Sequence, residues 1–135
     1  MSGGFQLPLR VYYEDTDSGG VVYYANYLRF LERARTECLR KLGFEQRQLA
    51  DGRGIAFAVR SLQVEYLKPA RLDDLIEVKS TIGELGRAQV VFLQRIEREG
   101  ELLVDATVRV ACLDLAKGKA AAIPKNIHDK LKELT

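Results

Sequence analysis

The chain has 135 residues, of which 47% are hydrophobic and 30% are charged. This length suits one domain, expected to cover residues 1–135, and the composition excludes an intrinsically disordered chain. The net charge of +2 is too small for a nucleic-acid-binding protein, and the sequence has no basic run with interleaved aromatic residues. The charge remains compatible with an anionic small molecule.

Targeting signals and cysteines both indicate the cytoplasm. No apolar run approaches the roughly 18 to 20 residues that cross a bilayer. The segment Met1 to Leu9 lacks the basic start and apolar centre of a signal peptide. Cys38 and Cys112 fall in an expected helix and an expected strand, where free buried thiols are common. We therefore expect a cytoplasmic protein with no membrane span and no disulfide.

The first part of the chain predicts a strand, a loop and a long helix. Alternating apolar residues predict a strand over Gln6 to Tyr13, and the acidic segment Glu14 to Gly20 ends it. From about Tyr23 to Leu42, apolar residues recur at helical spacing and cover much of the helix surface. Such a helix is expected to be wrapped by a sheet. Gly43 and Phe44 are typical of a left-handed C-terminal cap.

The second part predicts a weak helical turn at Glu45 to Asp51, four antiparallel strands and a short helix that begins near Pro124. The alternation of apolar residues changes parity near Arg60 and Ser61, which indicates a bulge. The order of elements predicts an α+β fold in which an antiparallel five-stranded sheet wraps one long central helix. The four later strands are expected over Ile55 to Tyr66, Ile76 to Ile82, Ala88 to Ile96 and Val104 to Cys112.

The most specific feature is the motif from Tyr13 to Tyr27, which reads YEDTDSGGVVYYANY. It runs from a strand through an acidic loop into a helix, so it places a carboxylate beside a helix start. Backbone N–H groups at a helix start lack intrahelical partners and carry the positive end of the helix dipole, so they can stabilise an oxyanion. A carboxylate there can act as nucleophile or base on the same carbonyl.

This motif and the following segment, Leu28 to Arg35, resemble the acyl-CoA thioesterases of the 4-hydroxybenzoyl-CoA thioesterase family, and most of all its small bacterial branch associated with the Tol-Pal cluster. The resemblance extends from about Leu9 to Ile123. It implies the hotdog fold and hydrolysis of a thioester to a free acid and CoA, with no metal or redox cofactor. It also implies a homodimer or homotetramer with sites at the subunit interface.

Asp17 is the expected catalytic residue. In the family that the motif resembles, the second Asp of the Asp-x-Asp pair attacks the thioester or activates water for that attack. The alternative is that Asp17 makes an Asx-turn before Gly19 and Gly20, or caps the helix. A metal site built on Asp15 and Asp17 is not expected, because no nearby His or Cys completes a usual ligand set.

Tyr24 is the second expected catalytic residue, at a position where many members of the branch carry His and others carry Tyr. A Tyr with an unperturbed pKa of about 10 is a poor base, so Asp17 would carry more of the chemistry. The resemblance assigns the oxyanion donor to the Tyr24 backbone N–H, which does not depend on the side chain. The alternative is that the Tyr24 side chain only packs.

Three further motif residues, Tyr13, Gly20 and Asn26, are expected to bind substrate or shape the loop, although Asn26 could equally cap the local backbone. The only histidine, His128, lies in the expected C-terminal helix, which argues against Ser-His-Asp and Cys-His chemistry. Glu32 is expected to pair with a neighbouring arginine. Basic residues that could bind the phosphates of CoA are Lys68, Arg71, Arg87, Lys117, Lys119 and Lys125.

The sequence therefore predicts a thioesterase for a short-chain or aromatic acyl-CoA. One alternative is a thioesterase for acyl carrier protein, and another is a non-catalytic hotdog protein that docks acyl carrier protein or an envelope-linked partner. Apolar residues occupy both parities of the segment Gln89 to Leu93. A sheet with one solvent-exposed face would expose part of these apolar residues, so a second copy of the chain is expected to cover that face.

Overall fold

A computed structural model describes residues 4–135. The expectations that a domain begins at residue 1 and that Met1 to Leu9 carries no signal fall partly on residues 1–3, which lie outside the described residues. The elements in chain order are β1 (Phe5–Arg10), the 3-10 turn η1 (Tyr13–Asp15), α1 (Asn26–Lys41), α2 (Gln46–Arg53), β2 (Ile55–Tyr66), β3 (Leu75–Leu85), β4 (Gln89–Arg98), β5 (Glu101–Asp114), β6 (Lys119–Ala120) and α3 (Lys125–Lys132).

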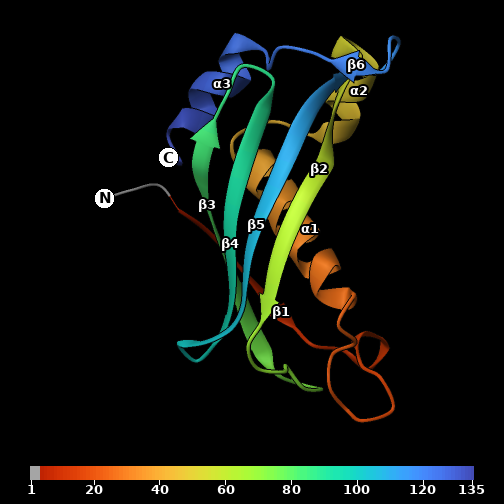
Figure 1. Cartoon of the computed structure of the whole chain (residues 1–135), viewed down its shortest axis with the longest axis vertical. Coiled ribbons are helices and arrows are strands. Elements are labelled where there is room, and N and C mark those ends of the chain that lie inside the picture. The colour runs from red at the N-terminus through yellow and green to blue at the C-terminus, as the bar shows by residue number, and fades with distance from the viewer. Residues whose placement is uncertain (1–3) are drawn as a thin grey trace.

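The strands form one antiparallel sheet in the order β1-β3-β4-β5-β2. Figure 1 shows this sheet curving along α1, with α2 and α3 at one end and the loop of the motif at the other. The predicted α+β arrangement of five antiparallel strands around a long helix is confirmed. The two-residue strand β6, which pairs with Leu113 and Asp114 at the end of β5, was not expected.

Two boundaries differ from the predictions. The first strand ends at Arg10, because Tyr13 opens the turn η1, in which the Asp15 carboxylate accepts the Tyr12 backbone N–H at 2.8 Å. The long helix begins at Asn26. The segment before it is extended, since Val22 forms an isolated bridge with Thr16.

The core lies between α1 and the inner face of the sheet. The helix buries Phe30, Leu31 and Ala34. Alternate residues of β5 are buried on the inner face of the sheet: Val104, Ala106, Val108, Val110 and Cys112. Cys38 and Cys112 are both free and buried, as expected. No helix among residues 4–135 is long and apolar enough to cross a membrane.

Two local predictions about backbone geometry are confirmed. The register of β2 against β5 shifts between Val59 and Ser61, which is the predicted bulge. Gly43 has a φ of +102° and follows α1, and the Phe44 N–H donates to the Leu39 carbonyl at 2.9 Å. Because a left-handed residue is strained for side chains other than glycine, Gly43 lets the chain leave the helix sharply.

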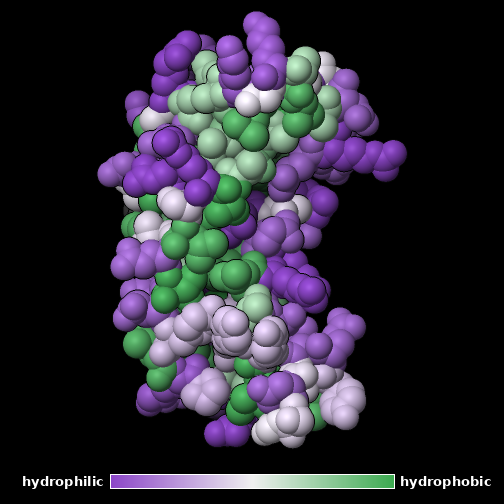
Figure 2. Space-filling model, turned by 45° about the vertical axis from the view of Figure 1, so that its right-hand side comes forward, coloured by the Kyte–Doolittle hydropathy of each residue, from purple (hydrophilic) through white to green (hydrophobic). Residues whose placement is uncertain are grey.

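The uncovered apolar surface is not where the sequence predicts it. The apolar residues of the segment Gln89 to Leu93 are Val90, Val91, Phe92 and Leu93, and only Leu93 is exposed. Val91 points to the outer face of β4 but is only 5% exposed, so the chain covers it without a partner. The larger uncovered surface lies on the edge strand β2, whose inner-face residues Val59, Leu62 and Tyr66 are 46%, 43% and 47% exposed. Figure 2, which turns this side of the molecule forward, shows an apolar band running down it. The reason is that α1 packs most closely against β1 and β3, on the other side of the sheet, and leaves the β2 edge bare.

Candidate functional site

The motif folds into a tight hairpin that leads into α1. Thr16 bridges Val22, and the Asp17 backbone N–H donates to the Val21 carbonyl at 2.9 Å. The turn closes with the Gly20 N–H donating to the Asp17 carbonyl at 3.1 Å, and Gly20 has a φ of +80°. A glycine is favoured at this position because other residues are strained at such a φ. Gly20 therefore shapes the loop, and its role in binding substrate stays a prediction.

Asp17 is exposed at the start of this turn. Its Oδ1 atom accepts the Gly19 N–H at 2.8 Å, so the Asx-turn considered from the sequence is present. The carboxylate also lines a hollow with Tyr23, Ala25 and Asn26 at the start of α1. An Asx-turn uses one carboxylate oxygen as an acceptor, so the structural role and a catalytic role are compatible.

Asp15 and Asn26 form the buried part of the motif. Asn26 Nδ2 donates to Asp15 Oδ1 at 2.8 Å, and the other carboxylate oxygen of Asp15 accepts the Tyr12 N–H. Both side chains are less than a tenth exposed. They tie the turn to the first residue of α1, while the residue that precedes the helix, Ala25, makes no side-chain cap. Asn26 therefore holds the loop in place rather than capping the backbone.

Tyr24 immediately precedes α1. Within residues 4–135, no hydrogen bond is recorded for the backbone N–H groups of Tyr24 and Ala25, whereas the Tyr23 N–H donates to the Asp15 carbonyl at 3.0 Å. The Tyr24 side chain lines a different hollow from Asp17, and its ring lies 6.3 Å from that of Tyr66. The structure thus brings Asp17 to the helix start but does not place the Tyr24 phenol in the same hollow.

The pKa values of Tyr23, Tyr27 and Tyr66 at this end are raised, so these three side chains are not bases at neutral pH. The neighbouring Tyr24 raises the pKa of Tyr23, and burial raises the pKa of Tyr66. Burial also raises the pKa of Tyr27, although the hydrogen bond from the Ala70 N–H opposes it. Tyr13 is 82% exposed, and its carbonyl accepts the Thr16 hydroxyl. A substrate contact by Tyr13 stays a prediction.

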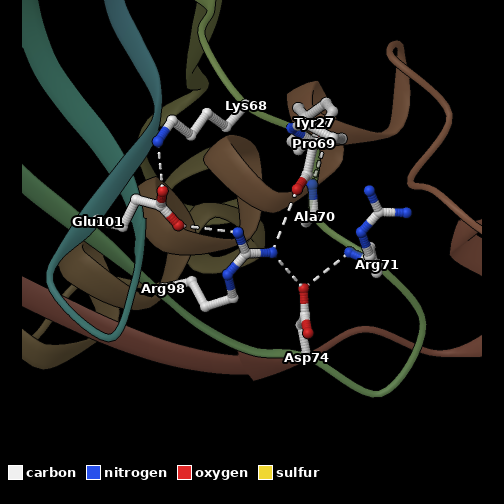
Figure 3. Close-up of polar contacts among 8 residues, drawn as sticks. All are labelled: Tyr27, Lys68, Pro69, Ala70, Arg71, Asp74, Arg98 and Glu101. Atoms are coloured by element: carbon white, nitrogen blue, oxygen red, sulfur yellow. Dashed lines mark hydrogen bonds and ion pairs between the residues drawn. The ribbon is translucent and has the colours of Figure 1, made fainter.

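A network of charged side chains, which the sequence did not reveal, supports the motif from the opposite side. Figure 3 shows Arg98 donating to Asp74 at 2.7 Å and to Glu101 at 2.9 Å, while Lys68 reaches Glu101 at 2.6 Å. The network links the turn between β4 and β5 to the segment between β2 and β3. Arg98 and Asp74 are each 23% exposed.

The segment that Arg98 holds is in direct contact with the motif. The Val22 N–H donates to the Ala70 carbonyl at 2.9 Å, and the Ala70 N–H donates to the Tyr27 hydroxyl at 2.9 Å. The Leu72 N–H donates to the Gly20 carbonyl at 3.2 Å. The start of α1 is therefore positioned by residues that are about 45 to 80 positions away along the sequence. No local sequence signal predicts such distant partners.

The basic residues proposed for CoA phosphates divide between the two ends of the sheet. Lys68 and Arg71 lie at the end that carries the motif, where Lys68 pairs with Glu101. The other four, Arg87, Lys117, Lys119 and Lys125, follow the far ends of β3 and β5. One protomer therefore does not gather all six around its own motif.

Other candidate groups do not form a second site in the described residues. Burial raises the pKa of Cys38 to about 11, with Lys41 opposing, and burial raises the pKa of Cys112, so both stay as thiols. Residues 4–135 contain no group of three or more His, Cys, Asp or Glu side chains placed to hold a metal ion. His128 is half-buried in α3. Glu32 accepts the Thr36 hydroxyl at 2.5 Å instead of pairing with an arginine, which corrects the prediction.

Residues 19–104 match the Thioesterase superfamily. The acyl-CoA thioesterase YbgC of Haemophilus influenzae is 50% identical over 127 residues, which cover 94% of this chain and 93% of that protein. The acyl-CoA thioester hydrolase YbgC of Escherichia coli O6:H1 is 50% identical over 130 residues, 96% of each chain. The crystal structure of a probable thioesterase from Bartonella henselae matches with a TM-score of 0.86 at 38% identity, covering 90% of this chain and 100% of that one.

The fold and these comparisons define a hotdog-fold enzyme that hydrolyses thioesters. The chain belongs to the thioesterase superfamily, which confirms the family and the fold predicted from the motif.

The Arg98 network predicts an acid-sensitive stability. Burial raises the pKa of Asp74, but hydrogen bonds from Arg98 and from the Arg71 N–H outweigh it and lower that pKa below its ordinary value. A lowered folded pKa stabilises the protein above the unfolded value of about 4, and the contribution is lost as the pH falls through the folded pKa. Asp74→Asn should lower the free energy of unfolding by about 1 kcal/mol at neutral pH, and by progressively less below about pH 4.

Urea denaturation between pH 3 and pH 7 measures this difference (roughly the range in which a carboxylate titrates). Asp51→Asn is the control, because the Asp51 carboxylate is 78% exposed and 4.0 Å from Arg47. A pH profile shared by the two variants would show that Asp74 contributes nothing beyond an ordinary surface charge.

Proposed function

We propose that the chain hydrolyses the thioester of a short-chain or aromatic acyl-CoA to the free acid and CoA. The observation that carries the proposal is the pair of backbone N–H groups at Tyr24 and Ala25, which have no hydrogen-bond partner among residues 4–135 and lie beside a hollow that Asp17 lines. Both relatives at 50% identity are named for the hydrolysis of acyl-CoA thioesters, which supports an acyl-CoA as the substrate.

In the proposed mechanism the thioester carbonyl oxygen accepts the Tyr24 N–H at the positive end of α1. The N–H and the helix dipole stabilise the negative charge that develops on this oxygen. Asp17 either attacks the carbonyl carbon or removes a proton from an attacking water. The C–S bond then breaks, and CoA leaves as its thiolate. In the general-base route the attacking water has by then supplied the oxygen of the free acid. In the nucleophile route a water must next hydrolyse the acyl–Asp17 anhydride, which releases the free acid and restores the carboxylate. No step assigns work to a metal or redox cofactor.

We infer that the active form is a homodimer, or a homotetramer of two such dimers, joined through β2. The outer edge of this twelve-residue strand has no described strand partner, and exposed edges of this length promote pairing. The exposed residues Val59, Leu62 and Tyr66 lie beside that edge. If two β2 strands pair antiparallel about a two-fold axis, the partner's Lys117 end approaches the motif and can supply cations for CoA phosphates.

A panel of acyl-CoAs with thiol detection tests the proposal directly. Hydrolysis of short-chain or aromatic acyl-CoAs supports it. Turnover of acyl carrier protein thioesters alone would favour the first alternative, and no turnover of either class would favour a non-catalytic binding protein.

Asp17→Asn should lower kcat by at least about 100-fold, the lower end of what a positioned acid–base group contributes. The melting temperature should change little, because the Asn carbonyl can still accept the Gly19 N–H of the Asx-turn. Asp15→Asn is the contrasting variant, and it should lower the melting temperature because the Asp15 carboxylate is buried between two N–H donors. Near-normal kcat in folded Asp17→Asn would overturn the catalytic assignment.

Tyr24→Phe should retain much of the activity, because the backbone N–H and not the phenol is assigned to the oxyanion. Tyr24→Pro, which removes the donor, should be far less active than Tyr24→Phe. Steady-state kinetics and circular dichroism on both variants make the comparison. A Phe variant as inactive as Asp17→Asn would assign chemistry to the hydroxyl.

Light scattering at micromolar concentration should give the mass of a dimer or a dimer of dimers. Leu62→Lys places a charge on the exposed face of β2 and should shift the protein toward monomer with loss of activity. Leu75→Lys is the matched control, since Leu75 is 51% exposed at the start of β3. A fully active monomer would contradict both the interface and a site shared between protomers.

A further inference from the structure

Gln94 is a fully buried polar residue at the centre of the sheet, 0% exposed on β4. Its Nε2 atom donates to the Leu31 carbonyl and to Ser80 Oγ, each at 3.0 Å. Because both amide hydrogens are engaged, the orientation of the side chain is fixed. Its Oε1 atom accepts a hydrogen bond from Arg35 at 3.0 Å, so Gln94 holds the guanidinium of Arg35 in place.

Arg35 is half-buried on α1, and Gln94 occupies only part of its donor capacity. Among residues 4–135, no ion pair involves Arg35. Glu32, about one turn earlier, engages Thr36 instead. Burial lowers the pKa of Arg35 and Glu32 partly offsets this, but a guanidinium stays charged. A partly desolvated cation with unused donors favours a carboxylate partner.

The guanidinium lies at the border of a hollow of about 110 Å³ between α1, the sheet and α3. The polar residues around it are Glu32, Arg35, Thr36 and Gln46. The remaining wall is apolar and includes Leu39, Phe57, Val59, Val90, Phe92 and Val110. A hollow of this kind fits a ligand with an apolar body and one anionic end.

The uncovered inner face of β2 runs from this hollow toward the candidate oxyanion site. Val59 lines the hollow, Leu62 follows it, and Tyr66 at the end of the strand meets the ring of Tyr24. This is the side of the molecule on which Figure 2 shows an apolar band. Arg35 lies nine residues after Asn26 on α1, about 14 Å at about 1.5 Å per residue. An acyl group held at Tyr24 can therefore extend along β2 toward Arg35.

We propose that Arg35 binds a carboxylate at the far end of the acyl chain, so that the enzyme selects thioesters of dicarboxylic acids over methyl-ended acyl groups of equal length. This inference rests on the proposed thioesterase function. It adds Arg35 as a specificity-determining residue, with Gln94 as the residue that positions it. A methyl-ended chain that reaches Arg35 would desolvate the cation further without neutralising it, which is unfavourable.

The test compares methyl-ended and carboxylate-ended acyl-CoAs of equal carbon number: butyryl with succinyl, hexanoyl with adipoyl, octanoyl with suberoyl. For the chain length that the enzyme hydrolyses best, kcat/KM for the carboxylate-ended acyl-CoA should exceed that for the methyl-ended acyl-CoA by at least about tenfold, because the carboxylate forms a charge-assisted pair with Arg35. Arg35→Gln keeps a donor for Gln94 and should abolish the preference. Arg35→Met should reverse it, because its side chain accepts a methyl end.

Two matched variants on α1 separate this role from a general effect of charge. Arg33→Met removes an exposed cation and should leave the ratio unchanged. Glu32→Gln removes the anion beside the hollow and should raise the ratio, since Glu32 repels an incoming carboxylate. An equal ratio in wild type and in folded Arg35→Gln would overturn the proposal, as would a parallel loss of activity on both substrate classes.

A binding experiment keeps the inference distinct from the proposed function. Octanoate should raise the melting temperature of the wild type and not of Arg35→Gln, whereas octanol should not discriminate between them. Arg35-dependent binding of octanoate in a protein that hydrolyses no acyl-CoA would support the carboxylate site and refute the thioesterase proposal. Hydrolysis of butyryl-CoA, together with octanoate binding that is equal in wild type and Arg35→Gln, would support the thioesterase proposal and refute the carboxylate site.

Discussion

The burial of α1 against a curved sheet is the constraint on which the rest of the structure depends. The helix buries one apolar stripe, which includes Phe30, Leu31, Ala34 and Cys38, against the inner face of the sheet, and the sheet bends around it with a bulge in β2. One helix cannot cover five long strands, so the edge strand β2 keeps exposed apolar residues on its inner face. The same packing that makes the core therefore also creates the groove and the unpaired edge.

Polar contacts fix the start of α1, whereas apolar packing fixes its middle. Asp15 and Asn26 fasten the turn of the motif to the first residue of the helix, and Tyr27 accepts a hydrogen bond from Ala70 in a distant segment. Arg98 restrains that segment by contacting the Pro69 carbonyl and the Asp74 carboxylate. A helix start fixed in this way can present its free N–H groups without reorganisation, which is what electrostatic stabilisation of an oxyanion requires.

Gln94 and Arg35 show how a polar group inside a core can set specificity. Replacing Gln94 alone would take a hydrogen-bond partner from the buried Ser80 hydroxyl and the Leu31 carbonyl, so the amide contributes to stability as well as to position. Here the amide of Gln94 is satisfied on all sides, and it fixes a guanidinium at the edge of an apolar hollow. The arrangement places one positive charge at a defined distance from the helix start.

Sequence and tertiary structure contributed different parts of this description. Periodicity located the five main strands and the three helices, the parity change located the bulge, and the density of the motif identified the family, because these signals depend on local geometry. The exact ends of β1 and α1 were missed, since the bonds of Asp15 and the bridge of Val22 override local preference.

The contacts between distant segments could not be predicted. Gln94 alternates with the inward-facing apolar residues of β4, which indicates a polar side chain in the core. Its partners on α1 and β3 are 14 and more residues away, so the sequence does not reveal them. Likewise, only the order of strands shows that β2 is an edge and that Val91 is already covered. The sequence by itself determined the elements and the family. The tertiary structure decided which polar groups meet and which apolar face stays open, because both depend on chain segments that only folding brings together.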